Sequence, residues 1–482
     1  MNEQDIYEGI GQVDDDVLLR SEKKRRARRP WWAAAAAAVV AVAVTVGLFF
    51  PRGSSSDSTG APLVTMAHAV AEAHYPEMAP YPDETAADFE AQYEAWRADK
   101  KEQNREIDNL DGLKAYARTS IPAFLSGAAG ENRAYSPLNV YMALSMLAEL
   151  TDGESRAQIL TLLGSDSLEA LRGQANALWN DHYSSDGATN SILASSLWLD
   201  EGVPFDQNTL DTLAETYYAS SFQGDLGTEE MNQALQDWLN GQTSGLLQEQ
   251  IGQLTLDPET LLALATTVYF QAQWDSTFSE EKTAPQTFHS PAGDVTVDFL
   301  HRDSSGYYFW GEHFSAVGLR LANDGGTMWL LLPDEGYTPE DLLADSEAMD
   351  FLLSGGDWAQ KKQLIVHLSL PKFDVSSQID LEDGLRQLGV TDVFDAGLAD
   401  FSPMLAGDAQ GIFVSQAKHG VRVAIDEEGV TAAAYTVMAA DGSSAPPEEE
   451  IDFTLDRPFL FALSDDQGLP LFAGVVNQPQ GQ

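Results

Sequence analysis

Residues 426–443 decide the fold, and they read Asp-Glu-Glu-Gly-Val-Thr-Ala-Ala-Ala-Tyr-Thr-Val-Met-Ala-Ala-Asp-Gly-Ser. The three acids and the glycine at the start are typical of a turn or a hinge. Residues 430–440 then contain no charge, no proline and no glycine, which favours a β-strand. Alternate side chains of a strand share a face, and one face here would be small and nearly flat. The residues of that face are Val430, Ala432, Ala434 and Thr436.

Residues 442–450 continue with Gly-Ser-Ser-Ala-Pro-Pro-Glu-Glu-Glu, a composition typical of an exposed loop that proteases can cut. A strand with one small face can slide between neighbours that are already packed. A long surface loop beside an alanine-rich strand explains the same residues. The stretch by itself fits both interpretations.

The flanks of this stretch resemble the serpin family. The family's hinge reads Glu-Glu-Gly-Thr-Glu followed by alanines, and residues 427–434 match it except at Val430 and Thr431. Three further segments resemble the opening of the family's conserved domain, its last strands and its C-terminal signature. They are residues 134–144, 453–461 and 470–477. Four matches in the family's order over roughly 370 residues are more specific than any one of them.

The resemblance implies an α+β serpin fold, with a large central mixed β-sheet, two smaller sheets, about nine helices and an exposed reactive-centre loop. The chain has 482 residues, of which 44% are hydrophobic, enough to build one large core. It contains no cysteine, which excludes disulfides and thiolate metal sites. In an exported protein, the absence of disulfides points to a bacterial source.

Three segments are expected to precede the serpin domain, which would cover residues 111–482. Residues 1–30 end in a Lys/Arg cluster and would form a cytoplasmic basic tail. Residues 31–50 are uncharged, and twenty helical residues are long enough to span a bilayer. Residues 51–110 would form a linker and a helical extension. The sequence therefore predicts a single-pass protein of the cell membrane with the serpin domain outside, and the alternative is secretion after signal cleavage.

The chain is strongly acidic, with 27 Lys and Arg against 75 Asp and Glu and a formal net charge of -48. Residues 1–30 hold seven of each sign, so the remainder carries 20 basic and 68 acidic residues. This charge excludes binding to nucleic acids. It would attract a cationic protein partner, although it could equally serve only to keep the protein soluble.

A serpin inhibits a protease and is not itself an enzyme. The resemblance implies that a serine protease cleaves the exposed loop, becomes acylated and is trapped when the freed strand inserts into the central sheet. The inserted segment must lack charge and proline, and residues 430–440 meet this requirement. The expected hinge residues are Glu427, Glu428, Gly429, Val430, Thr431, Ala432, Ala433 and Ala434.

The reactive loop is expected at about residues 427–450. The candidates for the cleaved bond lie among Ala440, Asp441, Gly442, Ser443 and Ser444. Their small side chains suggest an elastase-like serine protease, and the acids at 448–450 favour a cationic one.

Serpins also keep Ser, Ser, Asn and His in a hydrogen-bonded cluster where the central strands part. Ser136 and His419 match two of these positions, but Asn139 stands at the second serine and Thr266 at the asparagine. We expect that amide and hydroxyl have exchanged places within one network, which requires the four side chains to be in mutual reach. A buried histidine with satisfied partners would explain His419 without any gate.

No catalytic motif competes with this interpretation, because G-x-S-x-G, H-E-x-x-H, the phosphate loop and C-x-x-C are all absent. The acidic triplets at 14–16, 426–428 and 448–450 are expected to be solvated turns rather than metal sites. We therefore expect no cofactor and no metal, and a monomer whose partner is a serine protease. The alternatives are a non-inhibitory serpin that serves as a surface binding module and an inhibitor of cysteine proteases.

Overall fold

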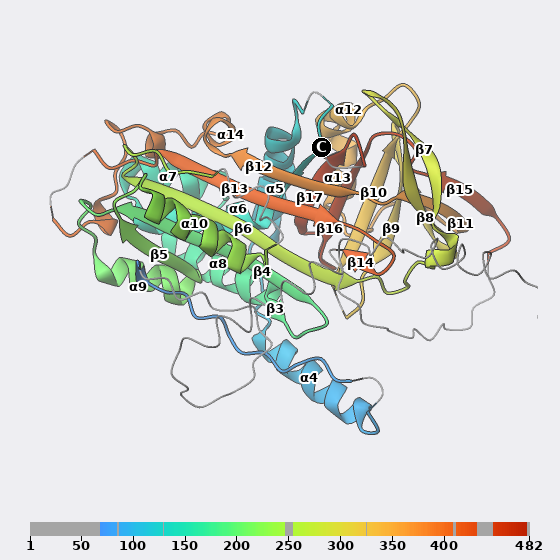
Figure 1. Ribbon diagram of the computed structural model, residues 1–482, viewed down its shortest axis with the longest axis horizontal. Helices are drawn as coiled ribbons and strands as arrows, with labels where there is room; N and C mark the ends of the chain where they lie inside the picture. Colours follow the sequence, from blue (N-terminus) through green and yellow to red (C-terminus); the bar gives the residue numbers. More distant parts are fainter. Residues whose placement is uncertain are drawn as a thin grey trace, which may run out of the picture. The chain divides into compact units, whose positions relative to one another are not determined.

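Two β-sheets with helices packed against them form the part of the protein described by the computed structural model (Figure 1). The described residues are 68–83, 86–128, 130–245, 254–323, 325–407, 411–430 and 447–479. They belong to one unit, residues 59–482.

The central sheet is mixed, and its strand order is β1-β5-β4-β6-β13-β12. Neighbours β5/β4 and β6/β13 are parallel, whereas β4/β6 and β13/β12 are antiparallel. Two short strands, β3 and β14, pair with β4 and β6. The bounds are β1 Ala69–Ala71, β3 Ser184–Ser185, β4 Asn190–Asp200, β5 Ala219–Gly224, β6 Leu262–Gln273, β12 Asp374–Asp380, β13 Gln416–Ala424 and β14 Gly429–Val430.

The second sheet runs β15-β11-β8-β9-β10-β16-β17-β2, with β7 paired to β8. The strands expected in two smaller sheets are thus joined by hydrogen bonds into one continuous path. The bounds are β2 Arg133–Tyr135, β7 Ala284–Ser290, β8 Gly293–Trp310, β9 Phe314–Arg320, β10 Thr327–Pro333, β11 Lys361–Pro371, β15 Glu450–Thr454, β16 Phe459–Ser464 and β17 Pro470–Val476.

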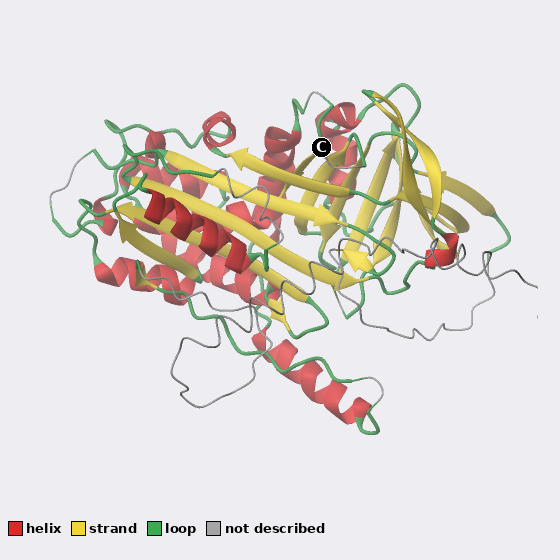
Figure 2. Ribbon diagram, in the orientation of Figure 1, coloured by secondary structure: helices red, strands yellow, loops and turns green. Residues whose placement is uncertain are grey.

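Ten α-helices lie within the described ranges, and Figure 2 shows most of them packed against the strands, while α4 projects away from the sheets. Three short 3-10 helices cover Glu280–Lys282, Asp392–Phe394 and Ser402–Met404. The α-helices are α4 Phe89–Gln103, α5 Leu110–Leu125, α6 Pro137–Leu150, α7 Gly153–Leu162, α8 Leu168–His182, α9 Gln207–Thr216, α10 Glu229–Gln242, α12 Pro339–Ala344, α13 Ser346–Leu352 and α14 Glu382–Gln387.

Helix α6 is buried along its whole length because it runs behind the central sheet, against β4 and β6 (Figure 1). Ser136 caps it, since its Oγ accepts a hydrogen bond from the backbone N–H of Asn139. Pro137 occupies the first helical position, where the missing N–H has no cost. Helix α10 packs on β6 in front of the sheet, so both faces are covered, as the nearly continuous burial of β4 and β6 requires.

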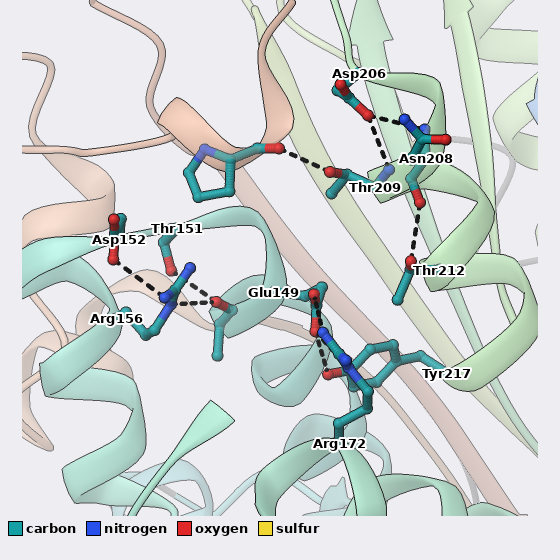
Figure 3. Close-up of polar contacts among 12 residues, drawn as sticks. Glu149, Thr151, Asp152, Arg156, Arg172, Asp206, Asn208, Thr209, Thr212 and Tyr217 are labelled. Carbon is teal, nitrogen blue, oxygen red and sulfur yellow. Dashed lines mark hydrogen bonds and ion pairs between the residues drawn. The ribbon is translucent and has the colours of Figure 1, made fainter. Parts of the chain in front are cut away.

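A buried carboxylate ties three helices together (Figure 3). Glu149 of α6 accepts hydrogen bonds from the Arg172 guanidinium of α8 at 2.6 and 3.2 Å. The Tyr217 hydroxyl, at the C-terminal end of α9, donates to the same carboxylate at 2.9 Å. Burial and the neighbouring carboxylate raise the pKa of Tyr217, so its hydroxyl keeps the proton that it donates. The helical layer behind the sheet is therefore fixed by polar as well as apolar contacts.

The expected localisation is corrected by the structure. No helix among the described residues is long and apolar enough to cross a membrane. Even α5, with 16 residues, falls short of the roughly 20 that a bilayer core needs. The expected membrane segment at 31–50 lies outside the described residues. Strand β1 and helix α4 lie in the region 51–110, where a linker and a helical extension were expected.

Candidate functional site

The central sheet has a partly filled strand position between β6 and β13. These two strands pair directly only between residues 263–267 and 416–420. At the C-terminal end of β6, the strand paired with it is β14, in which Val430 is antiparallel to Ala272. Val430 also forms a bridge with Ile425, just beyond β13 (Figure 1). One hinge residue therefore already lies between the two flanks of the sheet.

The hinge is anchored through its backbone to the segment after β6. The Trp274 indole Nε1 donates to the carbonyl oxygen of Asp426, and its backbone N–H donates to that of Glu428, both at 2.9 Å. The backbone N–H of Phe278 donates to the carbonyl of Glu427 at 2.8 Å. A Cβ at Gly429 would lie 2.2 Å from the carbonyl oxygen of Ala272, so only glycine allows this approach.

The side chain of Glu427 adds a charged contact to this anchor. Its carboxylate accepts hydrogen bonds from Lys372 Nζ at 2.7 Å and from Thr283 Oγ1 at 2.8 Å. Burial raises the pKa of Glu427, but these two bonds outweigh it and leave the pKa lowered. The hinge therefore starts from an ionised carboxylate that is 13% exposed, against a lysine that is 35% exposed.

His419 lies fully buried at the end of the opening where β6 and β13 pair. Its Nε2 accepts a hydrogen bond from the backbone N–H of Ser136 at 3.1 Å. The other ring nitrogen, Nδ1, is 2.8 Å from Thr266 Oγ1. Because a backbone N–H can only donate, the neutral ring carries its proton on Nδ1 and donates it to Thr266. Burial lowers the pKa of His419 to about 3, so the ring is neutral near pH 7.

Asn139 joins the same network from α6. Its backbone N–H donates to Ser136 Oγ at 3.3 Å. Its side-chain Nδ2 donates to the carbonyl oxygens of Ala194 on β4 and Thr267 on β6, at 3.3 and 3.0 Å. The structure thus brings together all four residues of the expected gate cluster, Ser136, Asn139, Thr266 and His419, but of these hydrogen bonds the one between Thr266 and His419 joins two side chains and the others involve backbone atoms. They link α6, β4, β6 and β13 through adjacent residues of β6.

The remaining expected site residues fall outside the described residues. These are the rest of the hinge, Thr431, Ala432, Ala433 and Ala434, and the candidates for the cleaved bond, Ala440, Asp441, Gly442, Ser443 and Ser444. The described chain stops at Val430 and continues from Pro447 into β15.

Sequence reasoning did not identify the residues that hold the hinge. Lys372, Thr283 and Trp274 lie 55, 144 and 152 positions from their hinge partners. Trp274 and Thr283 belong to residues 274–288, which resemble a serpin segment with Trp, Phe, Thr and Phe at the same spacing, and that resemblance was the available signal. No spacing along the chain marks Lys372 as the partner of a glutamate.

The central sheet therefore has a partly filled strand position beside a hinge that is anchored through its backbone. Residues 114–479 match the family model described as Serpin (serine protease inhibitor). The chain therefore belongs to the serpin family, whose members are generally serine protease inhibitors.

Similar proteins agree with this assignment. The chain is 29% identical over 386 residues to "Putative serpin-Z12" of Oryza sativa subsp. japonica, covering 74% of this chain and 88% of that protein. It is 29% identical over 354 residues to the leukocyte elastase inhibitor of Homo sapiens, covering 71% and 92%. These relatives are from a plant and a mammal, so they do not support the expected bacterial source.

Solved structures show the same fold. The thermophilic serpin tengpin in its native state superimposes with a TM-score of 0.69 and 25% identity, covering 78% of this chain and 96% of that one. Thyroxine-binding globulin in complex with thyroxine has a TM-score of 0.65 at 19% identity, covering 76% and 99%, a likeness that shows the fold alone. The expected serpin fold is confirmed.

Proposed function

We propose that residues 111–482 form a suicide-substrate inhibitor of serine endopeptidases, which traps the acyl-enzyme by inserting its cleaved loop into the central sheet. The observation that carries the proposal is the position of Val430, antiparallel to β6 and bridged to Ile425. The hinge leaves β13 and turns back beside it, so the chain already follows the path of an inserted strand.

The register of β14 predicts how far insertion can proceed. In an antiparallel pair the two residue numbers have a constant sum, and Val430 with Ala272 gives 430 + 272 = 702. Continuing this register pairs Ala440 with Leu262, the first residue of β6. The uncharged segment 430–440 therefore has the length that fills the remainder of β6.

The same register assigns the side chains to faces. Directly paired residues point to the same side of a sheet, so Ala432 and Ala434 would lie beside Phe270 and Val268, which are buried. Tyr435 would point to the opposite face. Because its inward side chains are small, the strand formed by residues 430–440 could enter beside β6 without displacing the buried side chains around it.

Insertion would replace a short parallel pairing by antiparallel ladders on both sides of the new strand. Parallel pairing is slightly less stable per residue. Each added backbone hydrogen bond contributes about 0.5–1.5 kcal/mol net, and roughly ten of them are a large driving force. The uncut protein must therefore be held by a kinetic barrier.

We propose an elastase-like target for this inhibitor. Small residues occupy positions 440–444, and a similar curated protein is named leukocyte elastase inhibitor. The excess of acidic residues would favour a cationic protease.

The test incubates the purified protein with an elastase and separates the products in denaturant. The expected result is a covalent complex that survives denaturation, together with a cleaved form that melts well above the intact protein. Cleavage with neither complex nor added thermal stability would overturn the proposal and favour a non-inhibitory binding module. Repeating the incubation with a cysteine protease tests whether inhibition extends to that class.

A further inference from the structure

A second polar cluster lies away from the hinge, where α8 ends beside the turn between β16 and β17. Asp181 and His182 belong to the end of α8, and Asp465 begins the turn. One potential ligand atom from each residue lies within 4.8 Å of the other two. The cluster borders a cavity of about 390 Å³ that also meets α4.

His182 presents an unpartnered nitrogen to this cluster. Its side chain is only 7% exposed, and its Nδ1 lies 3.0 Å from the carbonyl oxygen of Leu178. Because a carbonyl only accepts, Nδ1 carries the proton and donates it there. In the neutral ring Nε2 is then a lone pair, and it has no hydrogen-bond partner among the described residues.

Asp465 faces that lone pair with a carboxylate oxygen. Its Oδ1 accepts hydrogen bonds from the backbone N–H groups of Gln467 and Leu469, at 2.9 and 2.7 Å. These bonds fix the carboxylate so that Oδ2 lies 3.4 Å from His182 Nε2. Oδ2 is buried and likewise finds no hydrogen-bond donor among the described residues. With a neutral ring two acceptors would face each other, so either a proton on Nε2 or a cation lies between them.

A proton on Nε2 is one way to satisfy this contact, but the distance is long for it. Charge-assisted N–H···O bonds measure about 2.7–2.9 Å. A tetrahedral metal ion with ligands at about 2.0–2.1 Å separates neighbouring ligand atoms by about 3.4 Å. The observed 3.4 Å matches this separation between ligand atoms. A ligating histidine whose other nitrogen donates to a backbone carbonyl is also the usual arrangement around a metal.

We propose that Asp181, His182 and Asp465 bind a divalent transition-metal ion, with Zn²⁺ as the best match. One imidazole nitrogen and two carboxylate oxygens suit Zn²⁺, whereas Ca²⁺ and Mg²⁺ prefer oxygen ligands alone. The Asp181 side chain would have to move to reach coordination distance, since the three ligand atoms lie within 4.8 Å of one another, and water would supply the fourth ligand.

The basic residues of α4 that line this cavity do not fill the site. Lys100 donates to the carbonyl oxygen of Asn323 at 3.3 Å and lies over the Trp96 ring. Its charge lowers the ion's affinity but leaves the three ligands free. The bound ion would join the end of α8 to the second sheet, and it would stabilise the folded protein by mass action. This inference does not depend on protease inhibition.

The test uses the untagged full-length protein, stripped of metal with a chelator and titrated with Zn²⁺ alone in a calorimeter. We expect one strongly bound ion per chain and a rise in melting temperature that depends on the Zn²⁺ concentration. His182→Gln and Asp465→Asn should each weaken binding at least tenfold. Asp466→Asn makes the same charge change one residue further along the turn and should leave binding unchanged.

Titration with Co²⁺ keeps the proposal testable even if the ligand variants do not fold. A site with nitrogen and oxygen ligands in tetrahedral geometry should give intense visible absorption in the unmodified protein, and added Zn²⁺ should remove it. Absence of stoichiometric binding to the unmodified protein would overturn the proposal. Equal binding by folded His182→Gln would also overturn it, since the ion would then be held elsewhere.

Discussion

The opening between β6 and β13 is held in different ways at its two ends. At the hinge end, the side-chain contact is an ion pair, Glu427 with Lys372, and the lysine is about one-third exposed. At the gate end, a neutral network centred on His419 is fully buried. Water can replace the first contact as it breaks, but it cannot reach the second without opening the sheet.

This difference indicates how the two ends divide their work. An ion pair whose lysine is partly exposed can be exchanged for hydration as it breaks. A buried hydrogen-bond network is costly to break because its donors and acceptors would be left without partners. We infer that the hinge end controls when the strand enters and that the gate end controls how far the sheet opens.

The largest loss of inhibition is expected from a charge on the inward face of the inserted strand. Ala432→Glu would place a carboxylate beside the buried Phe270, and a buried charge without a partner costs about 3–5 kcal/mol. Slower insertion lets the protease deacylate, so the variant should become a substrate. The yield of covalent complex should fall about tenfold or more, since 1.4 kcal/mol is tenfold.

The matched control for this variant is Ala433→Glu, one residue along the strand. Its side chain would point to the opposite face, beside the half-buried Tyr269, where the charge can reach water. Complex formation by this variant should fall less. Equal loss in both variants would contradict the assignment of faces, and unchanged inhibition by Ala432→Glu would contradict insertion itself.

The next largest effect is expected at the hinge anchor, on the rate at which the uncut protein loses inhibitory activity. Lys372→Ala leaves the Glu427 carboxylate with only Thr283 as a side-chain donor, and an under-satisfied, largely buried charge costs about 1–3 kcal/mol. The uncut protein should therefore lose inhibitory activity faster on incubation at 37 °C, as the hinge enters the sheet without cleavage.

A second lysine–glutamate pair beyond the loop provides the control. Lys362 lies 2.6 Å from Glu449, but these side chains are 50% and 67% exposed. Exposed pairs contribute about 0–1 kcal/mol. Lys362→Ala should therefore leave the rate of inactivation nearly unchanged. If both variants inactivate equally fast, the hinge anchor has no special role.

The sequence could predict what is local or what resembles a known motif. It pointed to the uncharged run at 430–440, the hinge and the four gate residues because serpin motifs surround them, and the structure describes the hinge as far as Val430 together with the gate residues. The exchange at Asn139 and Thr266 could be noticed but not resolved, since its geometry depends on how β4 and β6 are aligned. The membrane expectation rested on the uncharged run at 31–50 and the basic cluster before it, and it is corrected because no helix among the described residues is long and apolar enough to cross a membrane.

Contacts between distant segments could not be predicted from periodicity. Lys372 meets Glu427 because β11 leads into the loop before β12, close to the hinge, and strand register places that loop. His182 and Asp465 are 283 residues apart, and neither stands in a metal-binding spacing. Such pairs depend on how separate helices, strands and loops pack together, which alternation along a single strand does not encode.

A smaller loss of stability is expected at the gate cluster, through His419, when the pH is lowered. The folded pKa of His419 is about 3, below the usual value of about 6.5, so folding favours the neutral ring. Its contribution to stability is complete above about pH 6.5 and is lost as the pH falls towards 3, by up to about 1.4 kcal/mol per pH unit. Urea unfolding at pH 7.5 and 5.5 measures this loss.

The control for the gate is His419→Gln, which cannot titrate. It should be less stable at pH 7.5 because the buried network loses its ring, but its stability should change less between the two pH values. Only the difference between the two proteins is informative, since other groups titrate as well. Parallel curves for both proteins would show that His419 does not set the pH dependence.

The smallest effect is expected where the reactive loop rejoins the second sheet, and there the pH dependence of stability has the opposite sign to that of His419. His367 on β11 lies 2.8 Å from Asp303 through Nδ1 and 3.3 Å from Glu450 through Nε2. Both partners are carboxylates, so both nitrogens can donate only in the imidazolium form, and hydrogen bonding to Asp303 and Glu450 raises the pKa of His367. Its contribution is complete below about pH 6.5 and is lost as the pH rises through the folded pKa.

His367→Gln should therefore flatten the decline in melting temperature above pH 6.5, whereas His419→Gln should change the pH dependence of stability below pH 6.5. If His367→Gln changes the pH dependence of stability mainly below pH 6.5, the opposite signs argued for His367 and His419 are wrong.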